Sequence, residues 1–355
     1  WGLHNEVYHP HEYTKELTRS LHDLAKTEDP DRYTVSVNGY GHMEHPVNLN
    51  ADIQGMNRYF GWYEKKLQDI EPWVEGLEKN YPDQKLMLTE YGADANIVHQ
   101  TEYLDNSLNW TKPFYPETFQ TKTHEYQWSV IAKHPYIVAS YLWNTFDFAT
   151  PLANRGDLPA RNMKGMVTFD RKTKKDAFWL YKAYWSDEEF VHLCSRRYAQ
   201  RTGEETTVKV YSNLPKVALY VDGRLFAEQE GSKVFVFEHV PMSDGFTQIS
   251  ARAGACADAM SIEKVAEPNQ AYIYVDPDDT GDDAGAANWF NVDDYKDVDT
   301  IVVREGYFSV KDKIGDIMKN EEAGNVLMQF MQATVKMKLK KSMLGMVKDM
   351  TLEGM

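Results

Sequence analysis

The segment KLMLTEYGADA, residues 85–95, joins an apolar run to a carboxylate. Leu86, Met87 and Leu88 are bounded by polar and turn residues, which is typical of an inner strand of a parallel sheet with both faces covered. Glu90 stands where such a strand would stop, and Gly92 permits a sharp departure of the backbone. Ligands and catalytic side chains gather at the carboxyl ends of parallel strands. Glu90 is therefore either a functional carboxylate or a solvated residue that caps a loop.

Four further apolar runs alternate with helix-like segments through residues 1–187. The runs are residues 1–5, 33–37, 52–57 and 136–143, and the helix-like segments are residues 12–26, 64–80 and 174–185. Strands that alternate with helices predict βαβ units and a parallel sheet. We expect an α/β fold that forms the second half of a (β/α)₈ barrel, with strands four to eight in residues 1–187.

After Trp185 the apolar period changes to two. TVKVYS (207–212), KVALYVDG (216–223), VFVFEHV (234–240) and FTQISAR (246–252) alternate apolar and polar residues, and Asp222-Gly223 indicates a hairpin turn. Residues 188–267 are therefore predicted to form a small immunoglobulin-like β-sandwich. Residues 268–305 are acidic and rich in Gly and Asp, which predicts a solvated linker.

The last segment, residues 306–355, is predicted to be a small helical module. Ser309-Val-Lys-Asp312 is expected to be a capping box that opens a helix over 314–319, with Asn320 as its stop. Amphipathic stretches follow at 321–332 and 335–350. A methionine-rich stripe can form an adaptable binding surface. Here we interpret it as the core of a helical bundle.

Composition excludes several classes of function. The 355 residues carry a net charge of −15, which opposes binding to nucleic acid or to an anionic membrane. No apolar run approaches the length of a membrane-spanning helix. Cys194 and Cys256 are too few for a disulfide framework, so we expect free thiols, with a single bridge as the alternative. The DPDDTG segment (276–281) resembles a calcium loop only loosely, and no metal is expected there.

A second carboxylate, Glu6, ends the first apolar run. It precedes Glu90 by 84 positions (90 − 6), which three βα units of about 28 residues each would fill. In a barrel both glutamates would stand on the same rim, at the ends of strands four and seven. Two rim carboxylates about 5 to 5.5 Å apart can hydrolyse a glycosidic bond with retention of configuration. Their pKa values must be pushed apart for this, and mutual repulsion contributes to that separation.

Five ordered motifs carry a resemblance to a known family. They are WGLHNE (1–6), NRYFGWY (57–63), LTEYGAD (88–94), WNTFDFA (143–149) and KGMVTFDRKTKKDAFWLYKAYW (164–185). Together they resemble the family-2 glycoside hydrolases, the family of β-galactosidases and β-glucuronidases, over roughly residues 1–265. The resemblance implies that Glu6 is the acid/base and Glu90 the nucleophile. It also implies sugar-binding and immunoglobulin-like domains and strands one to three ahead of Trp1, so we expect the chain to be a piece of a longer protein.

Further roles follow from the same resemblance. Asn5 matches the asparagine that holds the sugar 2-hydroxyl, with a strand-end residue bonded to backbone as the alternative. Tyr59 matches a tyrosine whose hydroxyl contacts the nucleophile, and Tyr63 one that lines the pocket, although either could be a core aromatic. Trp143 matches the indole under the sugar ring. Asp147 is expected to anchor a loop, and His4, His42 and His45 to be structural.

The prediction of which sugar is the substrate depends on Asn162-Met163-Lys164. Family β-glucuronidases carry Asn-x-Lys after strand eight, where the two side chains bind the C6 carboxylate. A charge-assisted hydrogen bond of this kind contributes about 1.5 to 3 kcal/mol. Leu158 replaces an arginine that serves the carboxylate in some glucuronidases, although Arg155 and Arg161 are nearby. Similar segments occur in relatives catalogued as β-galactosidases, so the sequence favours β-glucuronidase with β-galactosidase as the alternative.

Two other readings stay open. A related barrel enzyme, such as a mannosidase or an endo-glucanase, would share Glu6 and Glu90 but need not share NRYFGWY. A non-catalytic carbohydrate-binding or assembly piece is a reading of a different class. The expected partner is a carbohydrate, with no cofactor, nucleic acid or membrane, and a homo-oligomer of the complete enzyme stays open. Alone, the 355-residue chain is expected to be inactive and poorly stable, because a half-barrel exposes strand edges and apolar surface.

Overall fold

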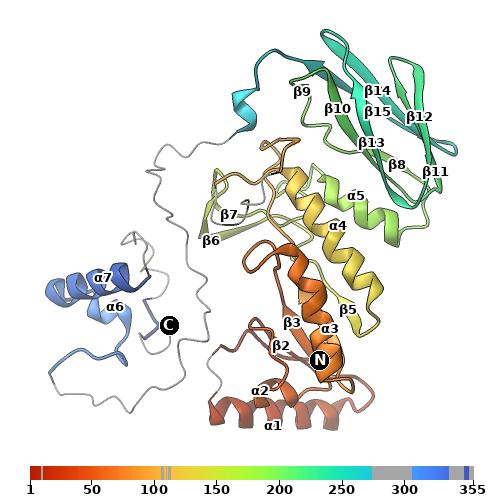
Figure 1. The fold of residues 1–355 in the computed structure, drawn as a ribbon. Coiled ribbons are helices and arrows are strands. Elements are labelled where there is room, and N and C mark those ends of the chain that lie inside the picture. The colour runs from red at the N-terminus through yellow and green to blue at the C-terminus, as the bar shows by residue number, and fades with distance from the viewer. Residues whose placement is uncertain are drawn as a thin grey trace.

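A computed structural model describes residues 1–8, 11–104, 108, 110, 113–273, 306–335 and 348–351. A parallel α/β segment comes first along the chain, antiparallel β-sheets follow it, and two short helical elements come last (Figure 1). Within the described residues no helix is both long and apolar enough to cross a membrane.

Five parallel strands form the sheet of the first segment. They are β1 (Gly2–Asn5), β2 (Val35–Asn38), β3 (Ile53–Asn57), β4 (Leu86–Glu90) and β5 (Ile137–Ser140), hydrogen-bonded in chain order. Each predicted apolar run thus contains a strand. The last strand ends at Ser140, three residues before Trp143, so the prediction of a strand over 136–143 was too long.

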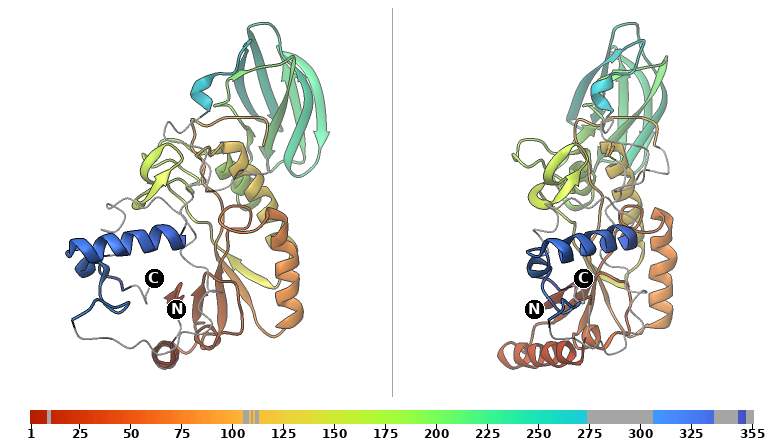
Figure 2. Two further views of the ribbon diagram at one scale, coloured as in Figure 1. Left: turned by 60° about the vertical axis from the view of Figure 1, so that its left-hand side comes forward. Right: turned by 90° about the vertical axis from the view of Figure 1, so that its left-hand side faces the viewer.

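Helices connect and cover these strands. They are α1 (Glu12–Glu28), α2 (Pro46–Leu49), α3 (Ile70–Asn80), α4 (Glu117–Lys133) and α5 (Asp176–Trp185), with a 3₁₀ turn η1 (Leu67–Asp69) before α3. The predicted helix over 64–80 begins later, at Ile70, and Pro72 lies in its first turn, where proline is tolerated. Helices α3 and α4 lie on one side of the sheet (Figure 2). Their apolar residues Val74, Leu77 and Val130 share one buried cluster with Leu86 and Leu88 of β4.

Helices α2 and α4 and an antiparallel hairpin were absent from the sequence prediction. Helix α4 buries polar side chains such as Gln120, Thr123 and Gln127 beside apolar ones, so it lacks a clear apolar stripe. The antiparallel hairpin of β6 (Phe148–Arg155) and β7 (Leu158–Asn162) contains prolines in both strands, which argues against strands in a sequence. Gly156 at its turn has φ +64°, and a Cβ there would lie 2.4 Å from the ring of Tyr115.

The second part consists of two sheets over one apolar core. The smaller sheet has the order β13-β10-β8 and the larger the order β12-β11-β14-β15-β9. Their bounds are β8 (Val191–Leu193), β9 (Gln200–Arg201), β10 (Glu205–Ser212), β11 (Lys216–Val221), β12 (Arg224–Glu230), β13 (Lys233–Pro241), β14 (Phe246–Ala253) and β15 (Cys256–Lys264). All pairs are antiparallel except β15 with β9.

The predicted hairpin turn is confirmed. Val221 pairs with Arg224, and Asp222 and Gly223 between them have φ of +47° and +76°. Positive φ at both central residues is what a tight two-residue hairpin requires. Four strands, β8, β9, β12 and β15, were not anticipated.

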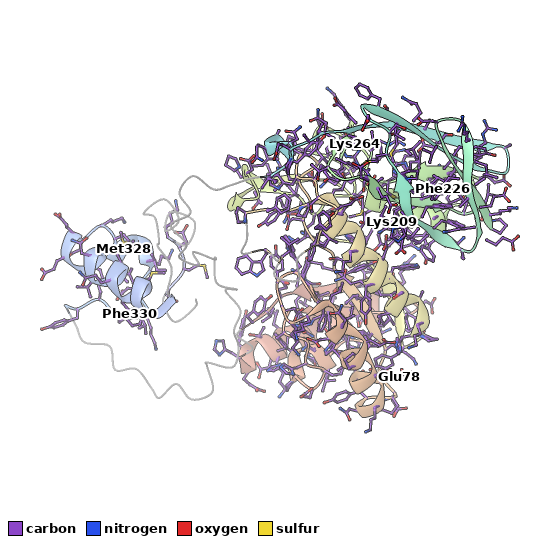
Figure 3. All side chains as sticks on the ribbon, turned by 45° about the horizontal axis from the view of Figure 1, so that its top comes forward. Glu78, Lys209, Phe226, Lys264, Met328 and Phe330 are labelled. Atoms are coloured by element: carbon purple, nitrogen blue, oxygen red, sulfur yellow. The ribbon has the colours of Figure 1, made fainter. Side chains whose placement is uncertain are left out.

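The described carboxyl-terminal residues hold α6 (Ile314–Ile317) and α7 (Glu321–Val335). The predicted capping box is wrong as a helix start, because α6 begins at Ile314 with Lys313 as its N-cap. Asp312 does accept the Ser309 N–H at 2.6 Å, one turn earlier. Met328 and Phe330 lie on α7 (Figure 3). The predicted linker beyond residue 273, with its DPDDTG segment, and most of the 335–350 stretch lie outside the described residues.

Candidate active site

The two predicted carboxylates stand at the carboxyl ends of parallel strands. Glu90 is the last residue of β4, and Glu6 directly follows β1. Glu6 has φ +52°, an unusual conformation for a residue other than glycine, and its N–H donates to Val37 O at 2.8 Å. Both side chains are half-buried. The sheet therefore presents two carboxylates on one rim.

Asn57 connects the two strand ends. Its Nδ2 donates to Glu6 Oε1 at 2.9 Å and to Asn5 Oδ1 at 3.1 Å. Its Oδ1 accepts a hydrogen bond from Thr89 Oγ1 at 2.7 Å. Asn57 is 3% exposed, so this network holds Glu6 and Asn5 in place from inside the sheet. The sequence analysis did not single out Asn57, although it ends β3 and opens NRYFGWY.

Glu90 is held by Tyr59 and has a raised pKa. Tyr59 Oη donates to Glu90 Oε2 at 2.6 Å, which places Tyr59 where the resemblance implies. Burial raises the pKa of Glu90 to about 7, the charge of Glu6 adds to the rise, and Tyr59, Lys164 and Asn57 oppose it. Because Glu6 influences this pKa, the two carboxylates share one electrostatic site. A raised pKa by itself suits a proton donor better than a nucleophile.

Tyr8 is a site residue that the sequence analysis missed. Its hydroxyl bonds to Glu6, and burial, followed by the charge of Glu6, raises the pKa of Tyr8 far above its ordinary value. A Cβ on Gly39 would lie 2.1 Å from the Tyr8 hydroxyl oxygen and 3.0 Å from Glu6 Oε1. Gly39 therefore leaves the space in which Tyr8 reaches the carboxylate.

Lys164 lies in the same site and is already paired. Its Nζ donates to Asp94 Oδ2 at 2.7 Å and also to the Tyr63 hydroxyl. The side chains of Lys164 and Asp94 are only 1% and 2% exposed. Asn162 Oδ1 accepts the Lys164 N–H at 3.1 Å, and Asp94 Oδ1 accepts the Met163 N–H at 2.7 Å. The Asn-x-Lys loop is thus fixed beside the carboxylates by Asp94, which ends the LTEYGAD motif and was not predicted to act.

Aromatic side chains form one wall of the site. Tyr59 and Tyr63 meet edge to face with centroids 4.9 Å apart, and Trp110 meets Tyr63 at 5.7 Å. Trp143 packs against the same cluster, which includes the buried Trp62, and meets the Phe148 ring at 5.8 Å. Tyr63 and Trp143 therefore belong both to the rim and to an aromatic core.

Asp147 and His45 make contacts that suit structural roles. Asp147 Oδ1 accepts from Lys175 Nζ at 2.8 Å and from the Gly165 N–H at 2.9 Å, which is the geometry of a loop anchor. His45 Nδ1 accepts the Val47 N–H at the start of α2. Burial lowers the pKa of His4.

Two groups of metal-ligand side chains occur in the described part of the chain. They are Asp176 with His192 and Cys194, and Glu71 with Glu75 and His134. In the first group Asp176 already accepts from Arg197 at 3.3 Å and from His192 at 3.0 Å. In the second group Glu71 is ion-paired with Lys133. Both thiols, Cys194 and Cys256, are free.

Comparisons with known proteins agree on one family. No family model matches the chain. A β-glucuronidase of Bacteroides fragilis is 33% identical over 250 residues, which cover 69% of this chain and 35% of that protein. A β-galactosidase of Bacteroides ovatus is 24% identical over 229 residues, covering 59% of this chain and 25% of that protein.

Solved structures give the same result. A crystal structure from B. fragilis, assigned provisionally as a β-galactosidase, is 64% identical with a TM-score of 0.72 over 76% of this chain and 41% of that chain. An FMN-binding β-glucuronidase of Facaelibacterium prausnitzii L2-6 is 35% identical with a TM-score of 0.73 over 77% and 42%. The chain spans well under half the length of these relatives. It is a homologue of the family-2 glycoside hydrolases, the β-glucuronidases and β-galactosidases, and covers only part of the full-length enzymes.

Proposed function

We propose that these residues belong to a retaining exo-β-glycosidase that hydrolyses terminal β-D-glycosides, with a β-D-glucuronide as the first candidate substrate. The supporting observation is that Glu6 and Glu90 end parallel strands on one rim and are linked through Asn57. In this proposal β1 to β5 are strands four to eight of a (β/α)₈ barrel, and residues 188–267 are an immunoglobulin-like domain. Residues 268–305 are a linker, and residues 306–355 are a helical module.

The proposed reaction has two steps. In the first, the Glu90 carboxylate attacks the anomeric carbon while Glu6 donates its proton to the departing glycosidic oxygen. This leaves the sugar as an ester of Glu90 and Glu6 as a carboxylate. In the second step Glu6 takes a proton from water, whose oxygen attacks the same carbon and releases Glu90. In this proposal Asn57 holds both Glu6 and Asn5, and Asn5 binds the sugar 2-hydroxyl.

The assignment of Glu90 as nucleophile and Glu6 as acid/base rests on the sequence motif. The raised pKa of Glu90 on its own would favour the opposite assignment. Trapping with a 2-fluoro glycoside in the complete enzyme decides between them, because the label stays on the nucleophile. We expect peptide mapping to find the label on Glu90. Glu90→Gln should lower turnover by about 10⁴-fold or more, as loss of a nucleophile does elsewhere. A label on Glu6 would reverse the assignment.

Lys164 supports a glucuronide as substrate, because its ammonium is close enough to Glu90 to lower the pKa of that carboxyl and would attract a sugar carboxylate. The Lys164 side chain is buried, however, and must be uncovered for direct contact. The named relatives include several β-glucuronidases. One observation favours β-galactosidase as the second candidate: Asp94 already neutralises Lys164 at 2.7 Å. A glucuronate would then share this lysine with a second carboxylate. A neutral C6 hydroxymethyl would leave the Asp94–Lys164 pair undisturbed.

Replacing Lys164 separates the two candidates. In the complete enzyme, Lys164→Ala is expected to lower kcat/KM for aryl β-glucuronides by at least about tenfold while nearly preserving any galactosidase activity. Lys216→Ala, which removes a lysine from the surface of the sandwich, is the matched control. Equal losses on both substrates would make Lys164 structural and put β-galactosidase first. A separate assay of the 355-residue chain addresses the non-catalytic reading, which turnover by that chain would contradict.

A further inference from the structure

A second hollow lies where the α/β segment meets the β-sandwich. This cleft has a volume of about 690 Å³. Its walls come from the loop after β5, from residues 171–174 and the first part of α5, and from β8, residues 196–197 and β15. Helix α5 lies next to the sandwich in Figure 1. None of the candidate active-site residues lines this cleft.

Basic side chains form part of the wall of the cleft, among apolar and aromatic residues. Arg171, Lys172, Lys174 and Arg196 line it together with one carboxylate, Asp258. Within the described part of the chain, no ion pair joins the first three to a carboxylate, although Asp170 lies close enough to Lys172, and Glu188 to Lys174, for the charges to interact. Such a cluster runs against the net charge of −15. Because like charges repel, a group of unpaired cations is most stable with an anion among them.

Arg197 also lines the cleft, but it is already neutralised. Its guanidinium bonds to both carboxylate oxygens of Glu117, with Nε 2.8 Å from Oε2, and Nη2 lies 3.3 Å from Asp176 Oδ1. It therefore acts as a structural support behind the cleft. The positive charge that has no ion-pair partner among the described residues comes from residues 171–174, because Arg196 is paired with Asp258.

Neighbouring groups fix two of these cations in place. The Arg171 guanidinium lies 4.0 Å from the Phe146 ring centroid, and its Nη1 donates to the Asp147 and Phe169 carbonyls at 3.1 and 2.9 Å. Lys174 Nζ lies 4.7 Å from the Phe178 centroid. Aromatic faces hold the cations by cation–π attraction, so they are occupied and do not offer a stacking platform. The cleft therefore presents fixed cations among aromatic rings.

Arg196 supplies a further unsatisfied donor. Its Nη2 is ion-paired with Asp258, whereas its Nε is buried without a hydrogen-bond partner. A buried donor without a partner costs roughly 1 to 3 kcal/mol. An anion oxygen that reached this nitrogen would remove that cost. The same cleft therefore combines unpaired cations with an unfilled hydrogen-bond position.

We propose that this cleft is a second carbohydrate-binding site, which takes a saccharide bearing sulfate or carboxylate groups against Arg171, Lys174 and Arg196 Nε. The choice of an anion rests on the cations alone. The choice of a saccharide rests on the proposed function, because a glycosidase would gain from a second site that holds another part of the same saccharide. The volume lies in the range of sites for small ligands.

Titration calorimetry with the purified protein tests this. Sucrose octasulfate serves as the probe because it has no β-glycoside that the active site would accept, with sucrose and inorganic sulfate as comparisons. We expect the octasulfate to bind at least about tenfold more tightly than sulfate, and sucrose not to bind. Arg171→Gln/Lys174→Gln should raise the dissociation constant at least about tenfold. Lys216→Gln/Lys264→Gln removes the same charge from the sandwich surface and should change it by less than about twofold.

The outcomes separate this proposal from the proposed function. Glu90→Gln is expected to leave octasulfate binding unchanged, so the site stands even if Glu90 is not a catalyst. Equal losses of affinity in the two double variants would mean that octasulfate binding depends on the net charge of the protein. The cleft would then not be the binding site. If inorganic sulfate bound as tightly as the octasulfate, the proposal that the ligand is a saccharide would be wrong. Thermal melts of both double variants show that each folds, because Arg171 and Lys174 are exposed side chains.

Discussion

The parallel sheet and the β-sandwich differ in where they place their buried polar side chains. Strands β2 and β3 bury Ser36, Asn38, Gln54 and Asn57 almost completely. The shared core of the sandwich consists of apolar residues that alternate with exposed ones, as β13 shows with Phe235 and Phe237 buried on either side of an exposed Val236. Both parts have an apolar core, and in the parallel sheet buried polar side chains also form a hydrogen-bonded network at the candidate site. Only the parallel sheet provides the geometry that a reaction needs.

Phe237 is the sharpest test of the packing in the sandwich. It is 1% exposed and lies opposite Val208 in the pair of β13 with β10. Phe237→Ala should lower the free energy of unfolding by about 3 to 5 kcal/mol, the usual cost of truncating a buried phenylalanine. Urea denaturation followed by circular dichroism measures this. Val236→Ala, on the exposed face of the same strand, is the matched control and should cost less than about 1 kcal/mol. If both substitutions lowered the free energy of unfolding by similar amounts, the buried face of β13 would not be what stabilises the sandwich.

The same difference explains which elements the sequence revealed. Strands such as β10 and β13 were visible because packing on one face imposes a period of two. Helix α4 was not, because its buried Gln120 and Gln127 bond to the backbone carbonyls of Ala93 and Phe60, far away in the chain. A buried glutamine looks like a surface residue until its partner is known. Hydrogen bonding across the fold therefore hides elements that packing would reveal.

The pH dependence of the free energy of unfolding tests the environment of Glu90, and the expected effect is of intermediate size. The pKa of Glu90 is raised to about 7 in the folded state, mainly by burial. A raised carboxyl pKa contributes stability that is fully present below its unfolded value and is lost as pH rises through about 7. Relative to Glu90→Gln, which does not titrate, the wild type should lose about 2 kcal/mol between pH 4 and pH 8, after allowance for partial exposure. Parallel stability curves for the two proteins would show that Glu90 has an ordinary pKa.

The candidate site was predictable at its strand ends and much less so in its support. Glu6 and Glu90 could be found because each ends a recognisable strand. Their partners come from far along the chain: Asn57 bonds to Glu6 across 51 positions, and Lys164 bonds to Asp94 across 70. Spacing in a sequence does not show which of many polar residues completes such a bond. The aromatic motif found Tyr59 but gave no separate signal for Asp94.

The smallest predicted effect concerns the junction between the two parts. Glu102, in the segment between β4 and α4, accepts the Thr207 N–H of β10 at 2.9 Å and lies 3.5 Å from Arg201 Nη1. The same segment carries Trp110 to the Tyr63 ring. The sandwich contributes no candidate catalytic residue, but this contact ties it to the aromatic wall of the site. Its role would be to hold the wall rather than to react.

Glu102→Ala should therefore destabilise the protein by about 1 to 2 kcal/mol, the cost of leaving the Thr207 N–H and the buried Arg201 with fewer acceptors. Arg201 keeps the Tyr198 and Ser195 carbonyls at 2.9 and 3.1 Å, so the loss should be partial. Glu102→Gln, which retains an acceptor oxygen, is the matched control and should cost less. Hydrogen exchange gives the decisive measurement: the Thr207 amide should exchange faster in Glu102→Ala, together with the Gln100 amide, which bonds to Tyr272 O at 3.1 Å. If only Thr207 responds, the contact is local, and the sandwich does not support the wall of the site.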